Sequence, residues 1–320
     1  MITISSYTIT SKNYCFGIDV GGTTIKLGLF DRAGNVLDKW EIKTRTEENG
    51  KYILPDAAQA VLTKMSDRGL RKEEIAGIRI GVPGPVGESG IVPVAVNLHW
   101  GKVNIVKEME EMTGIHTKAG NDANVAALGE CWKGGGEGYK DLILVTLGTG
   151  IGGGIIVDGK IVTGSHGAGG EIGHSHAEDA ITDPCNCGNC GCLEQVASAT
   201  GIVRLAKEEL ASSDEASSLR SGEVSARTVF DAVKAGDALA IRVAERFGKY
   251  LGKALAVFAC VTDPQIIVIG GGVSKAGPVL LDYIQKYYRQ YAFSACKDTV
   301  FALATLGNDA GIYGCAKMVL

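Results

Sequence analysis

One histidine and three cysteines stand close together in this sequence. Cys185, Cys187 and Cys192 lie within eight residues, and ten residues separate Cys185 from His174 upstream. One imidazole and three thiolates can fill the tetrahedral shell of a zinc ion, and a shell with no open position is structural rather than catalytic. The spacing therefore predicts a zinc site that fixes a segment which would otherwise be a loop.

Two carboxylates flank this His/Cys segment. Glu171 lies just before it, and Glu194 lies just after it. Acids beside a metal site must be solvated or must hold hydroxyl groups, and two carboxylates that accept bonds from vicinal hydroxyls could clamp a sugar. His176 and Cys190 lie in the same segment, so the spacing alone leaves the choice of zinc ligands open.

Two glycine-rich turns carry the donors that phosphate groups need. The first is Gly21-Gly22-Thr23-Thr24, which closely follows Asp19, and the second is Gly148-Thr149-Gly150. Backbone N–H groups in such turns form nests for phosphate oxygens. Phosphate would repel Asp19 unless a cation lay between them, which indicates Mg²⁺, an ion that prefers carboxylate, water and phosphate oxygens. Neither turn has the Gly-Lys-Ser/Thr ending of a P-loop. For the first turn, the alternative to phosphate binding is a hairpin with a capping Asp.

A further acid stands at the start of a predicted helix. Asn121-Asp122 directly follows a short predicted strand at 116–119, and the helix start would hold Asp122 in a fixed place. There it could accept a proton from an attacking hydroxyl. In a loose phosphoryl-transfer transition state that hydroxyl becomes acidic late, so a carboxylate of ordinary basicity suffices. The alternative is a structural role for the Asp122 side chain as the helix N-cap.

The segment Asn97-Leu-His99-Trp100 offers amide and aromatic groups that are typical of carbohydrate contacts. It follows a Gly/Pro loop at 82–87. An ordinary loop is the alternative interpretation.

Alternating strands and helices must position these side chains, which favours an α/β architecture. Each glycine turn lies between two predicted strands. Ten positions separate Gly21 from Asp31 and likewise Gly148 from Asp158, which indicates two copies of one strand–turn–strand unit and two related domains facing each other. The expected strands are 14–20, 24–30, 36–42, 75–81, 116–119, 142–147, 153–157, 160–162 and 265–269. The expected helices are 55–67, 104–112, 121–132, 201–211, 225–235, 238–260 and a last one from about 308.

The composition describes a globular chain without a nucleic-acid surface. With 320 residues, 45% of them hydrophobic and 21% charged, two domains with sizeable cores are expected. The net charge of −4 and the lack of a Lys/Arg cluster exclude nucleic acid as a partner. No apolar stretch approaches the ~18 residues of a membrane span. The nine cysteines are an odd number and no export signal is present, so we expect a cytoplasmic protein with reduced thiols.

Eight segments, taken in order, form a known pattern. They are Asp19-x-Gly-Gly-Thr23, Gly81-x-Pro-Gly84-Pro, Asn97-Leu-x-Trp100, Asn121-Asp122-Ala-Asn124, Gly148-Thr-Gly150, Glu171-x-Gly-His174, Cys185-x-Cys187-Gly-x-x-Gly191-Cys192-x-Glu194 and Gly270-Gly-Gly-Val-Ser274. This pattern resembles the ROK family (repressor, open reading frame, kinase) of bacterial sugar kinases, and most closely its glucokinases, over nearly the whole chain. The resemblance implies an actin-like (sugar kinase/heat-shock ATPase) fold with two lobes, built from related ribonuclease H-like domains around a nucleotide cleft. We expect a smaller N-terminal lobe at 1–120, completed by a C-terminal helix at about 308–320, and a larger lobe at 121–307.

The resemblance also implies roles for single residues. The general base falls on Asp122. His174 has two duties, with one ring nitrogen on zinc and the other toward a sugar hydroxyl. The zinc ligands fall on His174, Cys185, Cys187 and Cys192, while His176 and Cys190 lie outside the family spacing. The sugar contacts fall on Gly84, Asn97, Asn121, Asp122, Glu171, His174 and Glu194. The nucleotide and phosphate contacts fall on Asp19, Gly21, Gly22, Thr23, Thr24, Gly148, Thr149, Gly150, Gly271 and Gly272.

The implied reaction transfers the γ-phosphoryl group of ATP to the 6-hydroxyl of an aldohexose, with glucose as the expected substrate. Mg²⁺ would accompany ATP, and zinc would be structural. Related kinases are often dimers or tetramers, so we expect a homo-oligomer. Kinases for N-acetylmannosamine, N-acetylglucosamine, fructose or allose stay open. Polyphosphate as the donor also stays open, although the Gly-rich segment at 270–274 favours a nucleoside.

Two alternatives are not enzymes. A sugar-sensing repressor of the same family would carry a helix-turn-helix domain at its N-terminus, whereas only thirteen residues, which are not basic, precede the first predicted strand here. A non-catalytic sugar sensor is the second alternative. The presence of Asp19, both glycine turns and Asp122 together favours an enzyme over either of them.

Overall fold

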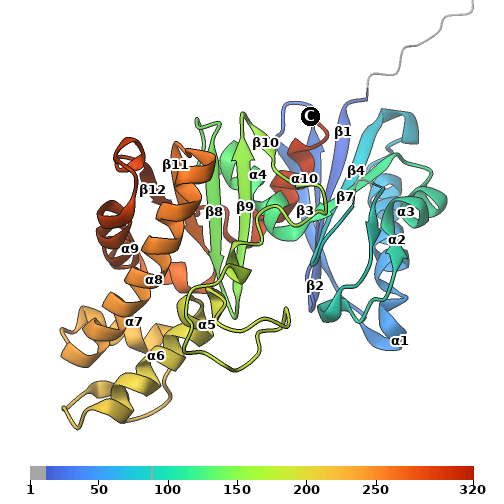
Figure 1. The fold of residues 1–320 in the computed structure, drawn as a ribbon. Helices are drawn as coiled ribbons and strands as arrows, with labels where there is room; N and C mark the ends of the chain where they lie inside the picture. The colour runs from blue at the N-terminus through green and yellow to red at the C-terminus, as the bar shows by residue number, and fades with distance from the viewer. Residues whose placement is uncertain (1–11, 88) are drawn as a thin grey trace, which may run out of the picture. The chain divides into compact units, whose positions relative to one another are not determined.

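The chain divides into two compact units, which Figure 1 shows in a computed structural model that describes residues 12–87 and 89–320. Unit 1 comprises Met1–Val125 and Gly311–Leu320, and unit 2 comprises Ala126–Ala310. Residues 1–11 and 88, which belong to the lobe expected at 1–120, lie outside the described residues. The two lobes were expected at 1–120 with about 308–320 and at 121–307. That they are functional domains stays a prediction.

Unit 1 is built on a five-stranded sheet with the order β3-β2-β1-β4-β7. β1, β2 and β3 form an antiparallel meander, and β4 and β7 run parallel to β1. The strands are β1 (Tyr14–Val20), β2 (Thr24–Asp31), β3 (Val36–Lys43), β4 (Ile75–Val82) and β7 (Thr117–Asn121). The other elements are α1 (Glu47–Gly50), α2 (Ile53–Asp67), α3 (Ile105–Thr113), α10 (Ala310–Lys317) and a small sheet of β5 (Ile91–Val92) and β6 (Val103–Asn104).

The core of unit 1 lies between its sheet and the helices α2 and α3 (Figure 1). β1 and β4 are nearly continuous apolar runs, as expected for inner strands that are covered on both faces, and Phe16, Ile18 and Ile80 are buried. β3 lies at the edge of the sheet and exposes every second residue. The apolar runs therefore place the ends of β1 and β4 firmly, and the loops that follow these ends carry predicted site residues.

Unit 2 is built on a second five-stranded sheet, with the order β10-β9-β8-β11-β12. Its strands are β8 (Leu142–Leu147), β9 (Ile151–Val157), β10 (Lys160–Ile161), β11 (Ile266–Gly270) and β12 (Val300–Leu303). Its helices are α5 (Glu194–Ala197), α6 (Ala199–Ser212), α7 (Ala226–Lys234), α8 (Ala238–Thr262) and α9 (Pro278–Tyr291), together with most of α4 (Asp122–Lys133).

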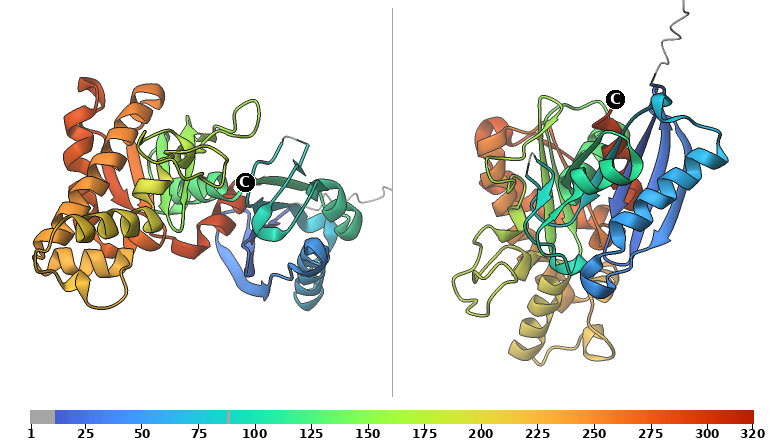
Figure 2. Two further views of the ribbon diagram at one scale, coloured as in Figure 1. Left: turned by 60° about the horizontal axis from the view of Figure 1, so that its bottom comes forward. Right: turned by 90° about the vertical axis from the view of Figure 1, so that its right-hand side faces the viewer.

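Helices α8 and α9 pack side by side in unit 2, as Figure 2 shows. Two glycines of α8 permit this approach. A Cβ atom on Gly248 would lie 2.6 Å from the carbonyl oxygen of Tyr283, and one on Gly252 would lie 2.7 Å from that of Ile284. No side chain larger than hydrogen fits at either position without moving α9.

The two sheets share one topology. In each, three antiparallel strands are followed by two parallel strands, and the strand order along the sheet is the same. The prediction of two related α/β units is therefore confirmed, and each glycine turn joins the first two strands of its sheet. Among residues 12–87 and 89–320, no helix has the length and apolar character needed to cross a membrane.

Helix α9, which begins with Pro278 at its first position, and strand β12 were not expected from the sequence, and neither were the short elements α1, α5, β5 and β6. The buried residues of α9, Leu280, Ile284 and Tyr288, recur every four positions, but charged and tyrosine residues between them weaken the apolar pattern. The last helix was expected from about residue 308, whereas a 3₁₀ turn occupies Gly307–Asp309 and α10 follows it.

Glu130 stabilises unit 2 from inside. Its side chain lies on α4, is 1% exposed, and accepts bonds from the backbone N–H groups of Gly135 at 2.8 Å, Thr305 at 3.1 Å and Leu306 at 2.9 Å. A buried carboxylate is tolerated when its oxygens are satisfied in this way. Glu130 therefore ties the loop after α4 to the segment that leads toward α10.

We expect Glu130→Ala to lower the free energy of unfolding by about 2–4 kcal/mol, because it leaves three N–H groups without their acceptor. Urea unfolding followed by circular dichroism measures this. Glu137→Ala, at an exposed position of the same region, is the matched control and should change stability by less than about 0.5 kcal/mol. Equal effects of the two substitutions would contradict the role given to Glu130.

Candidate functional site

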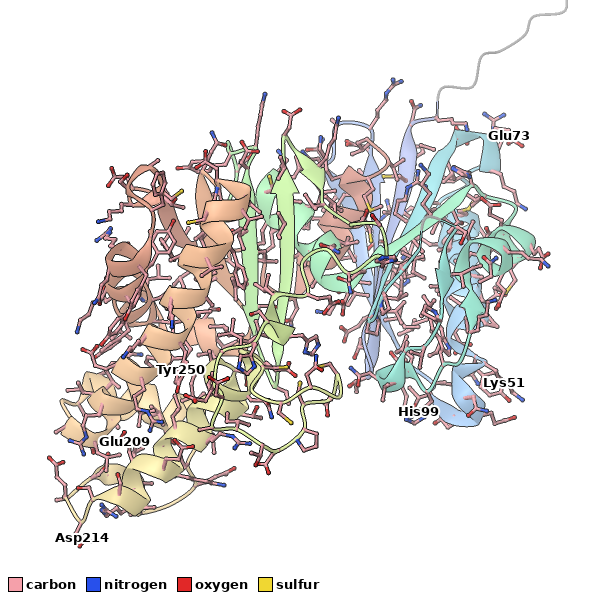
Figure 3. The ribbon with its side chains drawn as sticks, viewed as in Figure 1. Lys51, Glu73, His99, Glu209, Asp214 and Tyr250 are labelled. Carbon is pink, nitrogen blue, oxygen red and sulfur yellow. The ribbon has the colours of Figure 1, made fainter. Side chains whose placement is uncertain are left out.

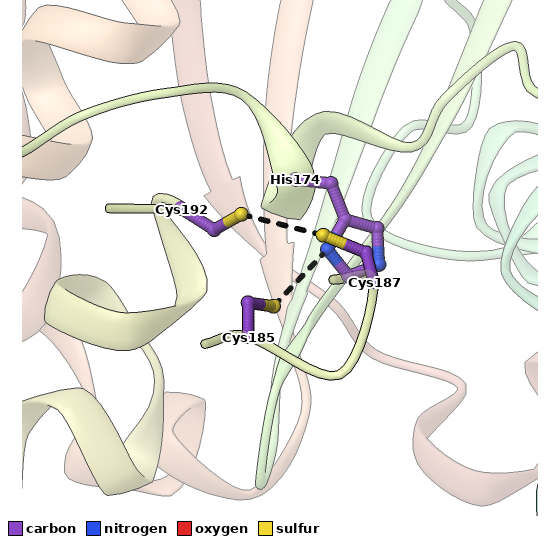
Figure 4. A group of neighbouring side chains, drawn as sticks. All are labelled: His174, Cys185, Cys187 and Cys192. Carbon is purple, nitrogen blue, oxygen red and sulfur yellow. Dashed lines mark hydrogen bonds between the residues drawn. The ribbon is translucent and has the colours of Figure 1, made fainter. Parts of the chain in front are cut away.

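The four predicted zinc ligands come together in unit 2. The ligand atoms of His174, Cys185, Cys187 and Cys192 all lie within 4.8 Å of one another (Figure 4). The Sγ atom of Cys185 lies 3.6 Å from Nδ1 of His174, and the Sγ atoms of Cys187 and Cys192 are 3.5 Å apart. In a tetrahedral zinc site with ordinary Zn–S and Zn–N bonds, a sulfur and a nitrogen ligand lie about 3.6 Å apart and two sulfur ligands about 3.8 Å apart. The donor set and its spacing therefore fit zinc.

Backbone pairing builds this cluster. A tight turn brings Cys185 and Cys187 together, with the Gly188 N–H donating to the Cys185 carbonyl at 2.8 Å. The two strands of the segment are joined because the Ala177 N–H donates to the Gly191 carbonyl at 2.7 Å. Gly191 has a φ of 73°, and a Cβ atom there would lie 2.1 Å from the carbonyl oxygen of Glu178. Only glycine fits at that crossing, which places Cys192 beside the other ligands.

The two additional candidates face other groups. The ring of His176 lies 3.2 Å from the Cys190 carbonyl and 2.8 Å from an Asp179 carboxylate oxygen. The thiol of Cys190 donates to the Thr182 carbonyl at 3.1 Å. Both side chains are exposed and lie outside the four-residue group.

His174 and Cys185 connect the cluster to the predicted sugar-binding acids. Its Nδ1 faces Cys185 and lies 3.8 Å from Oε1 of Glu194, while its Nε2 lies 3.9 Å from Oε2 of Glu171. The Cys185 thiol also donates to Oε1 of Glu194 at 2.8 Å. A metal on Nδ1 would therefore leave Nε2 directed toward Glu171.

The second glycine turn adjoins the same carboxylate. Oε2 of Glu194 accepts a long bond, 3.3 Å, from the Ile151 N–H, and a Cβ atom on Gly150 would lie 2.3 Å from it. The turn itself is held because the Ala199 N–H donates to the Gly148 carbonyl at 2.9 Å and the Thr200 hydroxyl donates to the Thr149 carbonyl at 2.8 Å. The start of α6 therefore fixes the turn that joins β8 to β9.

The predicted adenosine contacts lie next to this turn. β11 and β8 are parallel neighbours, with Gly270 opposite Thr146. Gly271 has a φ of 81°, and a Cβ atom there would lie 2.5 Å from backbone atoms of Leu147. Gly271 and the exposed Gly272 therefore adjoin the turn that begins at Gly148.

A cavity of about 820 Å³ opens beside Thr149 within unit 2. Most of its wall comes from α6 and from the segment before α7, which carry no recognised motif, so the sequence did not indicate this cavity. Its lining includes Thr149, Gln195, Thr200, Arg204, Lys207 and Glu223.

The first glycine turn is formed in unit 1 as predicted. The Gly21 N–H donates to the Thr24 carbonyl at 3.0 Å, and Thr44 anchors the turn through bonds to the Gly21 and Thr23 carbonyls at 2.7 and 2.9 Å. Gly21, Gly22 and Thr23 are exposed. A Cβ atom on Gly22 would lie 3.5 Å from the Asn97 carbonyl, so the turn and the predicted sugar contact Asn97 are neighbours.

Trp100 bears on the interpretation of the Asn97 segment. Its ring is 4% exposed, and its Nε1–H donates to the Gly50 carbonyl at 3.0 Å. These contacts favour a structural role for the Trp100 ring over a carbohydrate contact. Asn97 and His99 are exposed, and His99 lies at the surface of unit 1 (Figure 3).

Asn121 rather than Asp122 caps helix α4. Oδ1 of Asn121 accepts from the Asn124 N–H at 3.0 Å, and its Nδ2 donates to the Gly84 carbonyl at 3.1 Å. Oδ1 of Asp122 accepts a bond from the adjacent Ala123 N–H at 2.8 Å. Burial raises the pKa of Asp122, while bonds from the backbone N–H groups of Ala123 and of Asp122 itself lower it. Three predicted sugar contacts, Gly84, Asn121 and Asp122, are thus brought together, with the Asp122 carboxylate largely unengaged.

Asp19 lies at the end of β1 and is electrostatically linked to Asp122. Burial raises the pKa of Asp19 to about 7, the charge of Asp122 raises it too, and Lys26 opposes this. No motif indicated that Gly311 adjoins this carboxylate, yet a Cβ atom on Gly311 would lie 2.5 Å from Oδ2 of Asp19. The start of α10 therefore closes over Asp19.

We expect Asp19 to make the ligand-free protein less stable as the pH rises from about 4 to about 7. Its pKa is raised above the ordinary 3.8, so the folded chain holds the proton more tightly than the unfolded chain, and that advantage is lost through this window. Asp19→Asn should raise the free energy of unfolding at pH 8 by roughly 2 kcal/mol, since a buried charge disappears. Urea unfolding at pH 5 and pH 8 tests this. Asp67→Asn, at an exposed position, is the control. Equal stabilities of the wild type and Asp19→Asn at pH 8 would contradict this expectation.

Comparison with known proteins shows the family to which the chain belongs. The family model described as "ROK family" matches residues 15–320. A glucokinase of Halalkalibacterium halodurans is 44% identical over 95% of this chain and 94% of its own length, and a glucokinase of Thermotoga maritima is 35% identical over 95% and 96%. The crystal structure of a ROK family glucokinase from Streptomyces griseus in complex with glucose and AMPPNP has a TM-score of 0.73 and 30% identity, covering 95% of this chain and 98% of that one. The chain has the actin-like α/β fold of the ROK sugar kinases and belongs to the ROK family.

Proposed function

We propose that the protein is an ATP-dependent glucokinase, which transfers the γ-phosphoryl group of ATP to the 6-hydroxyl of glucose. The similarity to glucokinases over nearly the whole chain supports this. The structural observation that carries it is the Asp122 carboxylate, which lies partly buried at the start of α4 while Asn121 performs the capping. An acid that is placed but not engaged in structure is available as a base.

Each unit carries candidate sugar-binding residues. From unit 1, the Gly84 backbone, Asn97, Asn121 and Asp122 would contact hydroxyl groups. From unit 2, Glu171, Glu194 and Nε2 of His174 would do the same. Carboxylates and amides suit this role because each can bond two neighbouring hydroxyls.

Each unit also carries a glycine turn that suits nucleotide phosphates. Gly21 to Thr24 and Gly148 to Gly150 would donate N–H and hydroxyl groups to phosphate oxygens. Gly271 and Gly272 would lie against the adenosine, and the cavity beside Thr149 has ample volume for a base and ribose. Asp19 suits an Mg²⁺–phosphate complex. Burial raises the pKa of its carboxyl group, and a divalent cation would stabilise the charged form. Mg²⁺ would neutralise charge on the phosphates.

Zinc would build the sugar site rather than take part in the chemistry. His174 and the three thiolates fill its shell, so no position stays open for a substrate. A bound thiolate carries no proton, so Cys185 would no longer donate to Glu194. Oε1 of Glu194 would then be free to accept a bond from a sugar hydroxyl.

Asp122 would act as the general base. Its carboxylate would accept the proton of the 6-hydroxyl as that oxygen attacks the γ-phosphorus. The N–H groups of the two glycine turns would stabilise the charge that develops on the transferred group. Exclusion of water from the site would suppress hydrolysis of ATP, the competing reaction.

A panel of sugars tests this proposal. We expect ATP-dependent ADP release with glucose to exceed that with N-acetylmannosamine, N-acetylglucosamine, fructose and allose in kcat/KM, as measured by a coupled assay. A preference for an N-acetylated sugar would keep the fold and mechanism but overturn the substrate. Sugar binding without turnover would favour a sensor. Replacing ATP by polyphosphate in the same assay tests the identity of the phosphoryl donor.

We also propose that this enzyme is cytoplasmic and forms a homo-oligomer, either a dimer or a tetramer. Light scattering measures the oligomeric state.

A further inference from the structure

Gln195 joins the two ends of the zinc-binding segment. Its Oε1 accepts from the Cys192 N–H at 3.0 Å, and its Nε2 donates to the Asp183 carbonyl at 3.0 Å. Cys192 is a predicted zinc ligand, and Asp183 lies two residues before another, Cys185. One half-buried amide therefore holds both sides of the loop that presents the thiolates.

The same side chain lines the cavity that we assign to the nucleoside. Gln195 and Thr149 are both part of its wall. The preceding residue, Glu194, reaches from the Cys185 thiol on one side to the Ile151 N–H on the other. Residues 194 and 195 thus stand between the zinc cluster and the second glycine turn.

We infer that Gln195 is a positioning residue that couples zinc binding to nucleotide binding within unit 2. This inference rests on the proposed function for the identity of the nucleotide. Without zinc, the segment keeps only its hydrogen bonds, and loosening at Cys192 or Asp183 releases the Gln195 amide. Glu194 then shifts, and the 3.3 Å bond that its Oε2 accepts from the Ile151 N–H, beside Gly150, is weakened. The turn that holds the phosphates is disturbed in consequence.

Coupling of this kind is reciprocal, which gives two independent measurements. Zinc release from the wild-type protein to a chromophoric chelator should slow about five-fold when saturating AMPPNP is present. Zinc-depleted protein should bind a fluorescent ATP analogue about five-fold more weakly than zinc-loaded protein. Both measurements are made without sugar and without turnover.

Gln195→Met removes both hydrogen bonds and keeps the volume of the side chain. We expect it to release zinc about ten-fold faster than wild type in the absence of nucleotide, and AMPPNP should no longer slow the release. Gln195→Glu retains the acceptor for Cys192 but loses the donor to Asp183, so its release rate should fall between these two. Gln285→Met is the matched control, because that amide on α9 contacts only Arg289 among the bonds found for it. It should behave as wild type.

The outcomes separate the inference from the proposed function. If AMPPNP binds wild-type protein but leaves its zinc release unchanged, the coupling is wrong. If Gln195→Met, shown by circular dichroism to be folded, releases zinc at the wild-type rate, the positioning role is wrong. If AMPPNP and the fluorescent analogue bind to no form of the protein, the proposed nucleotide donor fails, and the coupling that rests on it fails with it. Faster zinc release by Gln195→Met without nucleotide would still support the positioning role.

Discussion

Replacing Asp122 by Asn should lower kcat about 1,000-fold while glucose still binds. The amide is isosteric and keeps an oxygen for the Ala123 N–H, so the start of α4 should be undisturbed. An amide cannot accept the proton of the attacking hydroxyl, and positioned bases contribute roughly 10²–10⁴ to the rate. A coupled ADP assay measures kcat, and isothermal titration with glucose measures binding.

Asp158→Asn is the control for this substitution. It makes the same change of carboxylate to amide in the exposed turn between β9 and β10, and it should leave kcat within two-fold of wild type. Appreciable turnover by Asp122→Asn, with glucose binding intact, would show that another group is the base. A loss of glucose binding without a loss of kcat at saturating glucose would make Asp122 a sugar contact alone.

Replacing Cys187 by Ser should remove zinc and weaken glucose binding more than ten-fold. Structural zinc sites contribute on the order of 10 kcal/mol in small zinc-binding peptides, and here that energy would hold a segment with little secondary structure. Without the metal, His174, Glu171 and Glu194 lose the support that fixes their positions. Metal content is measured by atomic emission, glucose affinity by titration, and stability by thermal unfolding.

Cys190→Ser is the matched control because it changes the same atom within the same segment. The Cys190 thiol donates to the Thr182 carbonyl and lies outside the ligand group. It should therefore retain one zinc per chain and the wild-type glucose affinity. If Cys187→Ser retains both metal and glucose affinity, the link between zinc and the sugar site fails, whereas zinc loss in Cys190→Ser would revise the ligand set.

Much of the fold was predictable because its signals are local. The glycine turns lie between strands whose apolar runs are continuous, and the repeat of ten positions from Gly21 to Asp31 and from Gly148 to Asp158 reflects two sheets of the same topology. The His/Cys segment was predictable for a similar reason. Metal ligands are few residue types with strict spacing, and the structure brings all four into one group.

The features that were missed depend on contacts that the residue types do not indicate, or on an interrupted apolar pattern. Gln195 touches the zinc segment and the cavity wall, and Gly311 closes over Asp19 from the far end of the chain. Neither residue type indicates such a role from its neighbours in sequence. For Trp100 the sequence left a carbohydrate contact and an ordinary loop open, and the partner of its ring is the Gly50 carbonyl, fifty residues away. Helix α9 was missed because its apolar positions are separated by charged and tyrosine residues.

The most direct test of the account is the identity of the product. The protein is incubated with ATP, Mg²⁺ and glucose, and the mixture is followed by phosphorus-31 NMR with authentic glucose phosphates as standards. We predict that glucose 6-phosphate and ADP accumulate in equal amounts with wild-type protein, and about 1,000-fold more slowly with Asp122→Asn. Release of ADP and inorganic phosphate without a sugar phosphate, or phosphate on any other hydroxyl, would contradict the proposed transfer to the 6-hydroxyl.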